Sequence, residues 1–191
     1  MAARRGLTLT EAAVLGLLTL EGERSGYDLL QLAHRSVGHV WAPAKSQLYA
    51  TLERLARDGL ARGREVAEIS RPDKILYRVT RAGRSALDVW LHTVGGSRDE
   101  QVLRMFLGGL TDTATLARHL EHYRDEAAEQ LEVLERLDRH ENTRQGQDFF
   151  HGLVLDLGLA SSRTSIEWAE QALLQLRVRA AASPSRSRTR A

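Results

Sequence analysis

Apolar residues recur at helical spacing in three segments of the first sixty residues. The expected helices cover about residues 9–21, 25–37 and 43–58. Thr8 and Glu11 have the Thr-x-x-Glu spacing of a capping box before the first helix. Pro43 suits the first turn of the third helix because its fixed φ fits there, and Gly59 suits the left-handed position after its end. The pattern therefore predicts three short helices in succession.

The pattern changes after the third helix, where apolar and polar residues alternate with the period of a β-strand. Two strands are expected over residues 60–69 and 75–80, and the sequence Ser-Arg-Pro-Asp at 70–73 is typical of a turn between them. Thr80 suits the N-cap of a fourth helix that runs to about residue 94. A β-hairpin is thus predicted directly after three helices.

The second half of the chain has the pattern of longer helices. They are expected over about residues 99–110, 114–141 and 145–179. In the second of them, residues advancing in alternating steps of four and three form a heptad seam: Leu116, Leu120, Tyr123, Ala127, Gln130, Leu134 and Leu137. Gly158 and the pair Ser161–Ser162 are expected to kink or interrupt the last helix.

Charge is distributed unevenly along the 191 residues, although the formal net charge is only +2. Residues 1–94 carry 14 basic and 10 acidic side chains, residues 95–180 carry 10 and 15, and residues 181–191 add three arginines. Val-Gly-Gly-Ser at 94–97 is the clearest linker signal. We therefore expect two domains, 1–94 and 95–180, and a disordered basic tail. The asymmetry is typical of a protein whose first domain alone approaches a polyanion, and chance fluctuation is the alternative.

Composition excludes several classes of protein. With no cysteine, the chain has no disulfide, no thiolate metal site and no cysteine nucleophile. The longest nearly apolar stretch, residues 12–20, is shorter than the roughly 20 residues that span a bilayer. No signal peptide precedes it, so we expect a cytoplasmic protein.

Common catalytic motifs are also missing from the sequence, including a glycine-rich phosphate loop, a Gly-x-Ser-x-Gly elbow and a His-Glu-x-x-His run. His119 and His122, with Glu121 between them, have a spacing that can bind a metal on one helix. Two histidines without a further close ligand make a poor site, so surface histidines are the better interpretation. We expect no catalytic residue, cofactor or metal, and a helical metal-dependent enzyme is kept as an alternative.

Three helices followed by a hairpin, on a basic segment, form the layout of a winged helix-turn-helix domain. The fold expected is mainly α with a small β-hairpin wing, followed by a long-helix dimerisation domain. In such a domain the third helix enters the major groove and the hairpin lies against the flanking backbone. The residues expected to contact DNA are Lys45, Ser46, Gln47, Tyr49, Ala50, Arg54, Arg71 and Lys74. A solvated helix face and an exposed turn are the alternative.

The segment Trp41–Leu60, which reads WAPAKSQLYATLERLARDGL, closely resembles the PadR family of bacterial transcriptional regulators. The features shared within it are Trp41, Pro43, Leu48, Tyr49, Leu52, Leu55, Gly59 and Leu60. Outside it, Ser25–Leu29, Leu76–Thr80, Ala82–Gly83 and Ile166–Trp168 also resemble that family. The similarity extends from about residue 7 to residue 176. One departure is Ala50, where the family frequently has a proline, and this puts the local shape of the third helix in doubt.

This resemblance implies a homodimeric repressor whose long C-terminal helices are exchanged between subunits. The residues expected at the dimer interface are Leu116, Leu120, Tyr123, Leu134, Phe149, Leu153 and Trp168. Two-fold symmetry would place the third helices about 34 Å apart, which matches an inverted-repeat operator in double-stranded DNA. A monomeric helical bundle that buries the same side chains is the alternative, as is a winged helix used only for protein contacts.

The resemblance also implies a small aromatic or drug-like effector that weakens DNA binding. The aromatic residues that would line an effector pocket are Trp90, Tyr123, Phe149, Phe150 and Trp168. Ordinary core packing is the alternative for each of them, because such side chains are usually buried. The operator, the regulated genes and the identity of the effector do not follow from the sequence.

Overall fold

The chain forms two compact units, Met1–Thr115 and Leu116–Ala191, in this computed structural model. The structure describes residues 6–36, 38, 41–67, 74–140 and 147–182. The tail beyond residue 182 and the turn at 70–73 lie outside the described residues. The elements of the first unit are α1 (Leu9–Glu21), β1 (Arg24–Ser25), α2 (Gly26–Ser36), α3 (Lys45–Arg57), β2 (Ala61–Val66), β3 (Lys74–Val79), α4 (Arg81–His92), α5 (Arg98–Phe106) and the 3-10 helix η1 (Gly108–Leu110).

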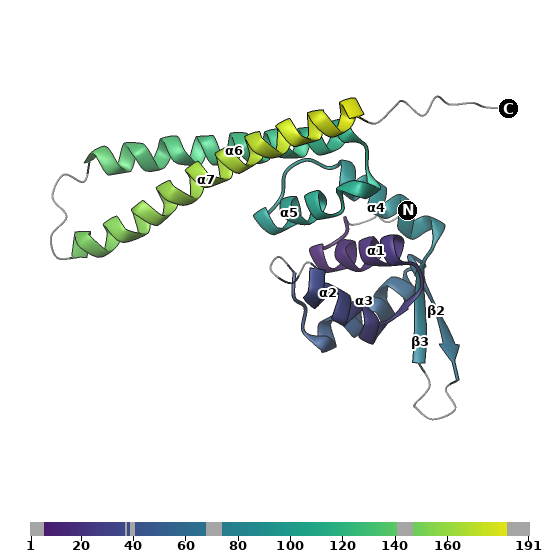
Figure 1. The fold of residues 1–191 in the computed structure, drawn as a ribbon. Helices are drawn as coiled ribbons and strands as arrows, with labels where there is room; N and C mark the ends of the chain where they lie inside the picture. Colours follow the sequence, from purple (N-terminus) through teal and green to yellow (C-terminus); the bar gives the residue numbers. More distant parts are fainter. Residues whose placement is uncertain (1–5, 37, 39–40, 68–73, 141–146, 183–191) are drawn as a thin grey trace. The chain divides into compact units, whose positions relative to one another are not determined.

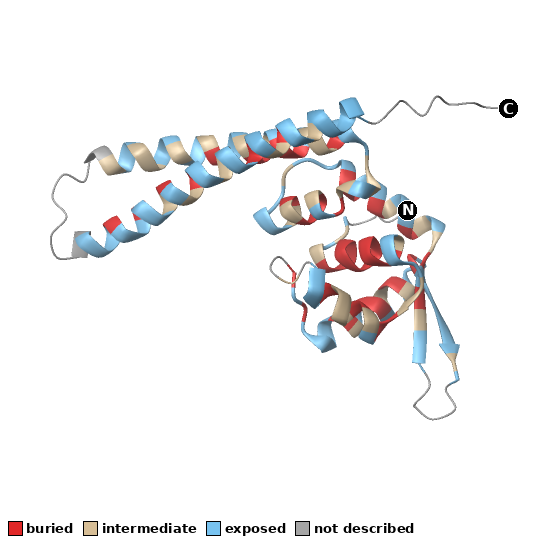
Figure 2. Cartoon of the chain, viewed as in Figure 1, coloured by how far each residue is buried: buried red, intermediate tan, exposed pale blue. Residues whose placement is uncertain are grey.

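Helix α1 is the centre of the first unit, and its middle is buried on nearly all sides (Figure 2). The predicted capping box is confirmed: the Thr8 hydroxyl accepts the Glu11 N–H at 3.3 Å, and the Glu11 carboxylate accepts the Thr8 N–H at 2.9 Å. A helix that is apolar all round must be covered by other elements. Helices α2, α3, α4 and α5 and strand β3 all contact it.

Helix α3 buries Leu48, Leu52 and Leu55 completely, as the spacing of these leucines predicts. Its end is a Schellman motif, in which Gly59 has a φ of 70° and the Leu60 N–H donates to the Leu55 carbonyl at 2.8 Å. The predicted start of this helix is wrong by two residues. Ala44, with extended backbone, is the N-cap, so Pro43 precedes the first turn instead of lying in it.

The hairpin strands β2 and β3 pair in antiparallel register, with Arg62 opposite Arg78 and Val66 opposite Lys74. Strand β1, which the sequence pattern did not indicate, adds a third strand on the other side of β3, giving the sheet order β1-β3-β2. Because β1 is only two residues long, it is too short to show the alternation of apolar and polar residues that indicates a strand. The mainly helical fold with a small β wing is confirmed, and the predicted N-cap Thr80 accepts the Gly83 N–H at 3.0 Å.

The division between the two units lies later than the expected boundary at residue 94. Gly95 and Gly96 have φ values of 87° and 99° and form a turn inside the first unit. After this turn, Leu103 and Leu107 are buried in the same core as α1. A side chain at Gly16 of α1 would collide with Leu107, the C-cap of α5, so α1 and the end of α5 meet closely there. Helix α5 therefore belongs with the winged helix.

The second unit consists of the antiparallel helices α6 (Thr113–His140) and α7 (Gln147–Ala182), which run side by side in Figure 1. Helix α7 is unbroken through Gly158 and Ser161–Ser162, so the expected interruption is wrong, and a kink there stays a prediction. The reason that the helix continues is packing: a Cβ at Gly158 would lie 3.0 Å from Leu134 of α6, so the glycine lets the helices approach, and Ser162 is buried.

Candidate functional site

The exposed face of α3 carries most of the residues predicted to contact DNA. Lys45, Ser46, Gln47 and Ala50 are exposed together on it, and Tyr49 is half-buried at its edge. The Lys45 ammonium lies 5.9 Å from the centroid of the Tyr49 ring, a cation–π contact that holds the cation beside the face. This surface presents donors and a small apolar side chain of the kind that reads base edges in a major groove.

Gln47 lies at the boundary between this face and the interior. Its amide Nε2 is 3.4 Å from the Thr10 hydroxyl, which also accepts a hydrogen bond from the Trp41 indole N–H at 3.3 Å. The Gln47 side chain is nevertheless exposed. The contact orients the amide on the surface of α3, where its carbonyl oxygen can accept and its amide group can donate.

Arg54, another residue predicted to contact DNA, forms an ion pair within the first unit. Its Nε donates to Glu11 Oε1 at 2.8 Å, and its Nη2 donates to the Thr51 hydroxyl at 3.3 Å. The Glu11 side chain is only 2% exposed, whereas that of Arg54 is 38% exposed. The guanidinium therefore joins α3 to α1. The sequence pattern did not indicate this ion pair, because its two residues lie 43 positions apart and the capping box already accounts for Glu11.

The hairpin places Lys74 at the start of β3, where it is exposed. The carboxylate of Asp28 lies near enough for Lys74 to help lower its pKa, after the larger effect of a hydrogen bond from Ser25. Arg71, the other predicted residue of the hairpin, lies outside the described residues. Lys74 and the exposed residues of α3 are therefore the predicted DNA-contacting residues that lie on the described surface.

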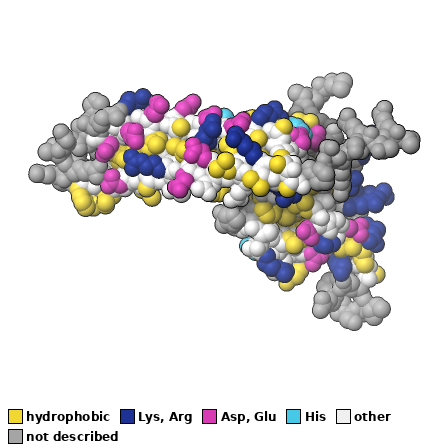
Figure 3. Space-filling view, turned by 45° about the horizontal axis from the view of Figure 1, so that its top comes forward, with side chains coloured by type: hydrophobic (Ala, Val, Ile, Leu, Met, Phe, Trp, Pro, Cys, Tyr) yellow, Lys and Arg dark blue, Asp and Glu magenta, His cyan; other side chains and the backbone are white. Residues whose placement is uncertain are grey.

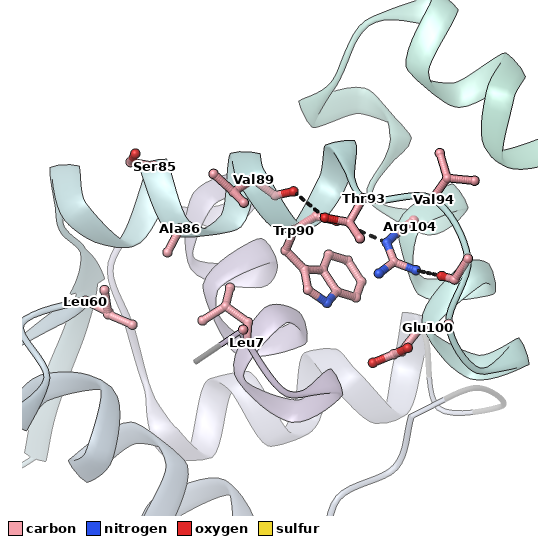
Figure 4. Close-up of a pocket in the computed structure, with 13 residues that line it drawn as sticks. Leu7, Leu60, Ser85, Ala86, Val89, Trp90, Thr93, Val94, Glu100 and Arg104 are labelled. Atoms are coloured by element: carbon pink, nitrogen blue, oxygen red, sulfur yellow. Dashed lines mark hydrogen bonds between the residues drawn. The ribbon is translucent and has the colours of Figure 1, made fainter. Parts of the chain in front are cut away.

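A cavity of about 540 Å³ lies within the first unit, between α4, the Gly95–Gly96 turn and α5 (Figure 4). Its walls are largely apolar, with Leu7, Ala86, Val89 and Trp90 among them. Of the five residues expected to line an effector pocket, Trp90 is the one that does so here. Apolar walls with few polar groups are typical of small-molecule sites.

Arg104 and Glu100 are the charged groups of this cavity, and neither was predicted to line it. Arg104 is 3% exposed, its Nε donates to the Trp90 carbonyl at 3.1 Å, and its Nη1 donates to the Gly95 carbonyl at 2.6 Å. The guanidinium lies 4.2 Å from the centroid of the Trp90 ring. Burial lowers the pKa of Arg104, and the charge of Glu100 opposes this. Glu100 also lines the cavity, so its wall carries charges of both signs, and the guanidinium is the more buried of the two.

The remaining aromatic candidates lie in the second unit. Tyr123 and Trp168 pack edge to face, with ring centroids 5.6 Å apart, and the Tyr123 hydroxyl is 3.3 Å from that of Ser165. Phe149 and Phe150 contact each other edge to face and are exposed. The Tyr123–Trp168 contact joins α6 to α7, which is a packing role.

The predicted interface residues divide into two groups. Leu120 and Tyr123 are buried and Leu116 and Leu134 are half-buried, so these four pack within the unit. Phe149, Leu153 and Trp168 are exposed. They belong to an apolar face of α7, on the side away from its buried seam: Phe149, Phe150, Leu153, Val154, Leu157 and Trp168. Hydrophobic side chains are visible along the helical pair in Figure 3.

The histidines do not form a metal site among the described residues, where no group of three potential ligands occurs. His122 lies 3.3 Å from the carboxylate of Glu126. His119 is 1% exposed, so the interpretation of both as surface histidines is wrong for His119. In the described part of the chain, no helix is long and apolar enough to cross a membrane.

Comparison with known proteins matches residues 14–89 to the "Transcriptional regulator PadR-like family" and residues 97–177 to "Virulence activator alpha C-term". The chain is 25% identical over 169 residues to the "Probable transcriptional regulator Rv1176c" of Mycobacterium tuberculosis, covering 79% of this chain and 89% of that protein. It is 34% identical over 79 residues to the "Negative transcriptional regulator PadR" of Bacillus subtilis, covering 41% of this chain and 43% of the relative.

Solved structures with a similar fold include Bacillus subtilis PadR in complex with operator DNA. That chain is 24% identical, with a TM-score of 0.45, and the match covers 88% of this chain and 99% of that chain. A second structure, PadR with p-coumaric acid, is 23% identical with a TM-score of 0.40 and covers 92% and 99% of the two chains.

Proposed function

This chain belongs to the PadR-like family of transcriptional regulators, and from that premise we propose that it is a homodimeric repressor that binds an inverted-repeat operator and releases it when a small molecule binds. The exposed polar face of α3 carries this proposal. It is presented beside a basic hairpin on the half of the chain that carries the net positive charge. A helix so placed fits the major groove, and the hairpin fits the flanking phosphates.

Fluorescence anisotropy with the DNA upstream of the protein's own gene tests the proposal directly. We expect that DNA to bind at least about 1,000-fold more tightly than random DNA at the same salt concentration. Equal affinity for both DNAs would contradict operator recognition. It would favour the alternative, a winged helix that contacts only proteins.

Two residues of α3 should separate sequence reading from phosphate binding. Replacing Gln47 by alanine should cost about 1–3 kcal/mol on the operator and much less on random DNA, because in the proposed complex its exposed amide would pair with a base edge. Replacing Lys45 by alanine should weaken both DNAs alike and reduce the salt dependence by about one phosphate contact. Anisotropy titrations at several salt concentrations measure both effects. Identical profiles for the two variants would contradict this division of roles.

The dimer is supported by the exposed apolar face of α7. Large side chains such as Leu157, 70% exposed, and Phe150, 59% exposed, lie along it. Contiguous apolar surface of this kind is typical of protein interfaces. A second copy of α7 is the matching occupant, because an isologous interface covers the same face on both subunits. The assembly then presents two copies of α3 to the two half-sites of the operator.

The effector is proposed to bind in the cavity beside Arg104. A planar apolar molecule fits the walls formed by Val89 and Trp90, and an anionic group on it would pair with the buried guanidinium. Trp90 lies on α4, which is continuous through Thr80 with the wing strand β3. Occupation of the cavity would therefore act on the element that supports the wing.

Replacing Arg104 by methionine should abolish the preference for an anion, because methionine keeps the apolar stem and removes the charge. Calorimetry with p-coumaric acid and its uncharged methyl ester provides the measurement. We expect the natural protein to bind the acid at least about tenfold more tightly than the ester, and the variant to bind both equally. Arg98→Met, at an exposed arginine of the same helix, is the control. An unchanged preference in R104M would contradict the role of Arg104.

A further inference from the structure

A cluster of arginines lies on the face of the wing that points away from α3. Alternate residues of a strand share one face. Tyr77 and Val79 of β3 are buried, and Glu53 and Tyr49 of α3 lie near enough to help raise the pKa of Tyr77, after the larger effect of burial. Arg78 lies between these two residues on the strand, so its side chain is on the opposite, outer face.

The arginines of this face are held in an unfavourable electrostatic arrangement. Arg62 and Arg78 are directly opposite each other on β2 and β3, and like charges in that position repel. Arg81 and Arg84 follow in the first residues of α4, which has no acidic residue in its first turn. A helix N-terminus carries partial positive charge, so cations there are disfavoured.

Little negative charge compensates the cluster. Glu23 and, along α4, Asp88 are the acids beside it, and the Glu23 carboxylate pairs with Arg64 at 2.7 Å. That hydrogen bond is the largest cause of the lowered pKa of Glu23, and the charges of Arg64 and Arg78 lower it further. Within the described ranges, no acid forms an ion pair with Arg62, Arg78, Arg81 or Arg84.

The four arginines surround a hollow of about 610 Å³. Its other walls include Leu18, Gly22 and Thr80, so the hollow lies between the wing, the end of α1 and the start of α4. None of the residues around it lines the cavity beside Arg104. The hollow is therefore a recess distinct from both the α3 face and the proposed effector cavity.

We propose that this arginine hollow binds a small molecule carrying a chain of phosphate groups, such as inorganic triphosphate or a nucleoside triphosphate. Guanidinium groups form paired hydrogen bonds to phosphate oxygens, and a helix N-terminus adds a favourable dipole. A chain of phosphates supplies the several negative charges that four neighbouring arginines require. A recess suits such a compact ligand better than it suits a DNA backbone, whose phosphates lie along an extended ridge.

Calorimetry on the DNA-free protein, with sodium triphosphate, ATP and sodium sulfate as ligands, tests this proposal. We expect triphosphate and ATP to bind at least about tenfold more tightly than sulfate, because one sulfate engages only part of the cluster. Arg62→Gln combined with Arg84→Gln should reduce triphosphate affinity at least about tenfold. Arg177→Gln combined with Arg179→Gln removes the same charge from exposed positions of α7 and should leave the affinity unchanged.

Thermal unfolding supplies a second readout that does not depend on the heat of binding. Triphosphate should raise the Tm of the natural protein and of the α7 control, but not that of R62Q/R84Q. The unliganded R62Q/R84Q variant should be at least as stable as the natural protein, because repulsion between arginines is relieved. Equal losses of affinity in both double variants would overturn the proposal, since binding would then follow net charge alone.

The alternative is that these arginines contact DNA, and measuring the operator affinity of R62Q/R84Q distinguishes it. If triphosphate binds no more tightly than sulfate, and R62Q/R84Q loses as much operator affinity as Lys45→Ala, the arginines contact flanking DNA and the proposal is wrong. Triphosphate binding is measured without DNA. A failure of operator recognition would therefore leave this test intact.

Discussion

Replacing Arg54 by alanine should lower the free energy of unfolding by about 2–4 kcal/mol. The change removes the ion-pair partner of Glu11, whose side chain is 2% exposed, and leaves that carboxylate in the interior with its remaining hydrogen bonds. Loss of one partner of a fully buried pair costs about 3–5 kcal/mol, and the 38% exposure of Arg54 reduces this because water can enter in its place. Urea unfolding monitored by circular dichroism gives the measurement.

Arg57→Ala is the matched control, because Arg57 lies one turn further along α3 and is exposed. Its loss should change stability by less than about 0.5 kcal/mol. A double-mutant cycle with Glu11→Gln should return a coupling energy of about 1–3 kcal/mol for the pair. If R54A is as stable as R57A but loses discrimination between operators, then Arg54 reads a base and the structural role is wrong.

Introducing two glutamates into the apolar face of α7, as Leu153→Glu with Leu157→Glu, should convert the dimer to a monomer. Both side chains are more than half exposed in the subunit, so its own fold should tolerate the change. In a dimer the same positions would bury two unpaired charges on each side. Light scattering should then report a single species of 21.3 kDa at micromolar concentration.

Operator affinity should fall at least about 100-fold in the same variant, because the two copies of α3 no longer bind as one unit. Arg177→Gln with Arg179→Gln changes the net charge equally outside the 149–157 part of the face and should remain dimeric. A natural protein that is already monomeric at micromolar concentration would contradict the proposed assembly. So would an L153E/L157E variant that stays dimeric with its fold intact.

Local elements of this fold follow from the sequence because the signals lie within a few residues of one another. The capping box at Thr8 and Glu11, the buried leucines of α3 and the left-handed Gly59 were all predictable in this way. The starting point of α3 was not, because Pro43 is compatible with the residue before a helix as well as with its first turn. The predicted bounds of an element therefore differ from the observed bounds where one residue suits two local conformations.

The candidate site depended more strongly on contacts distant in sequence. The spacing of polar residues identified the exposed face of α3, but it assigned Arg54 to DNA, and only the approach of α1 showed that this guanidinium meets Glu11. Arg104 gave no signal, because nothing local indicates that an arginine of α5 is buried against Trp90. Charged side chains reach several ångströms, so their partners are decided by which helices meet.

The sequence by itself therefore determined the succession of three helices and a wing, the polar face of α3 and the long helices that follow. Hydrophobic periodicity and helix capping depend on residues within one or two helical turns, so the sequence alone contains these signals. The tertiary structure decided that α5 joins the winged helix, that α7 continues through Gly158, and that the arginines divide among an ion pair, a cavity and the outer face of the wing. Each of these outcomes depends on close packing between surfaces far apart in sequence. A local sequence pattern contains no information about such contacts.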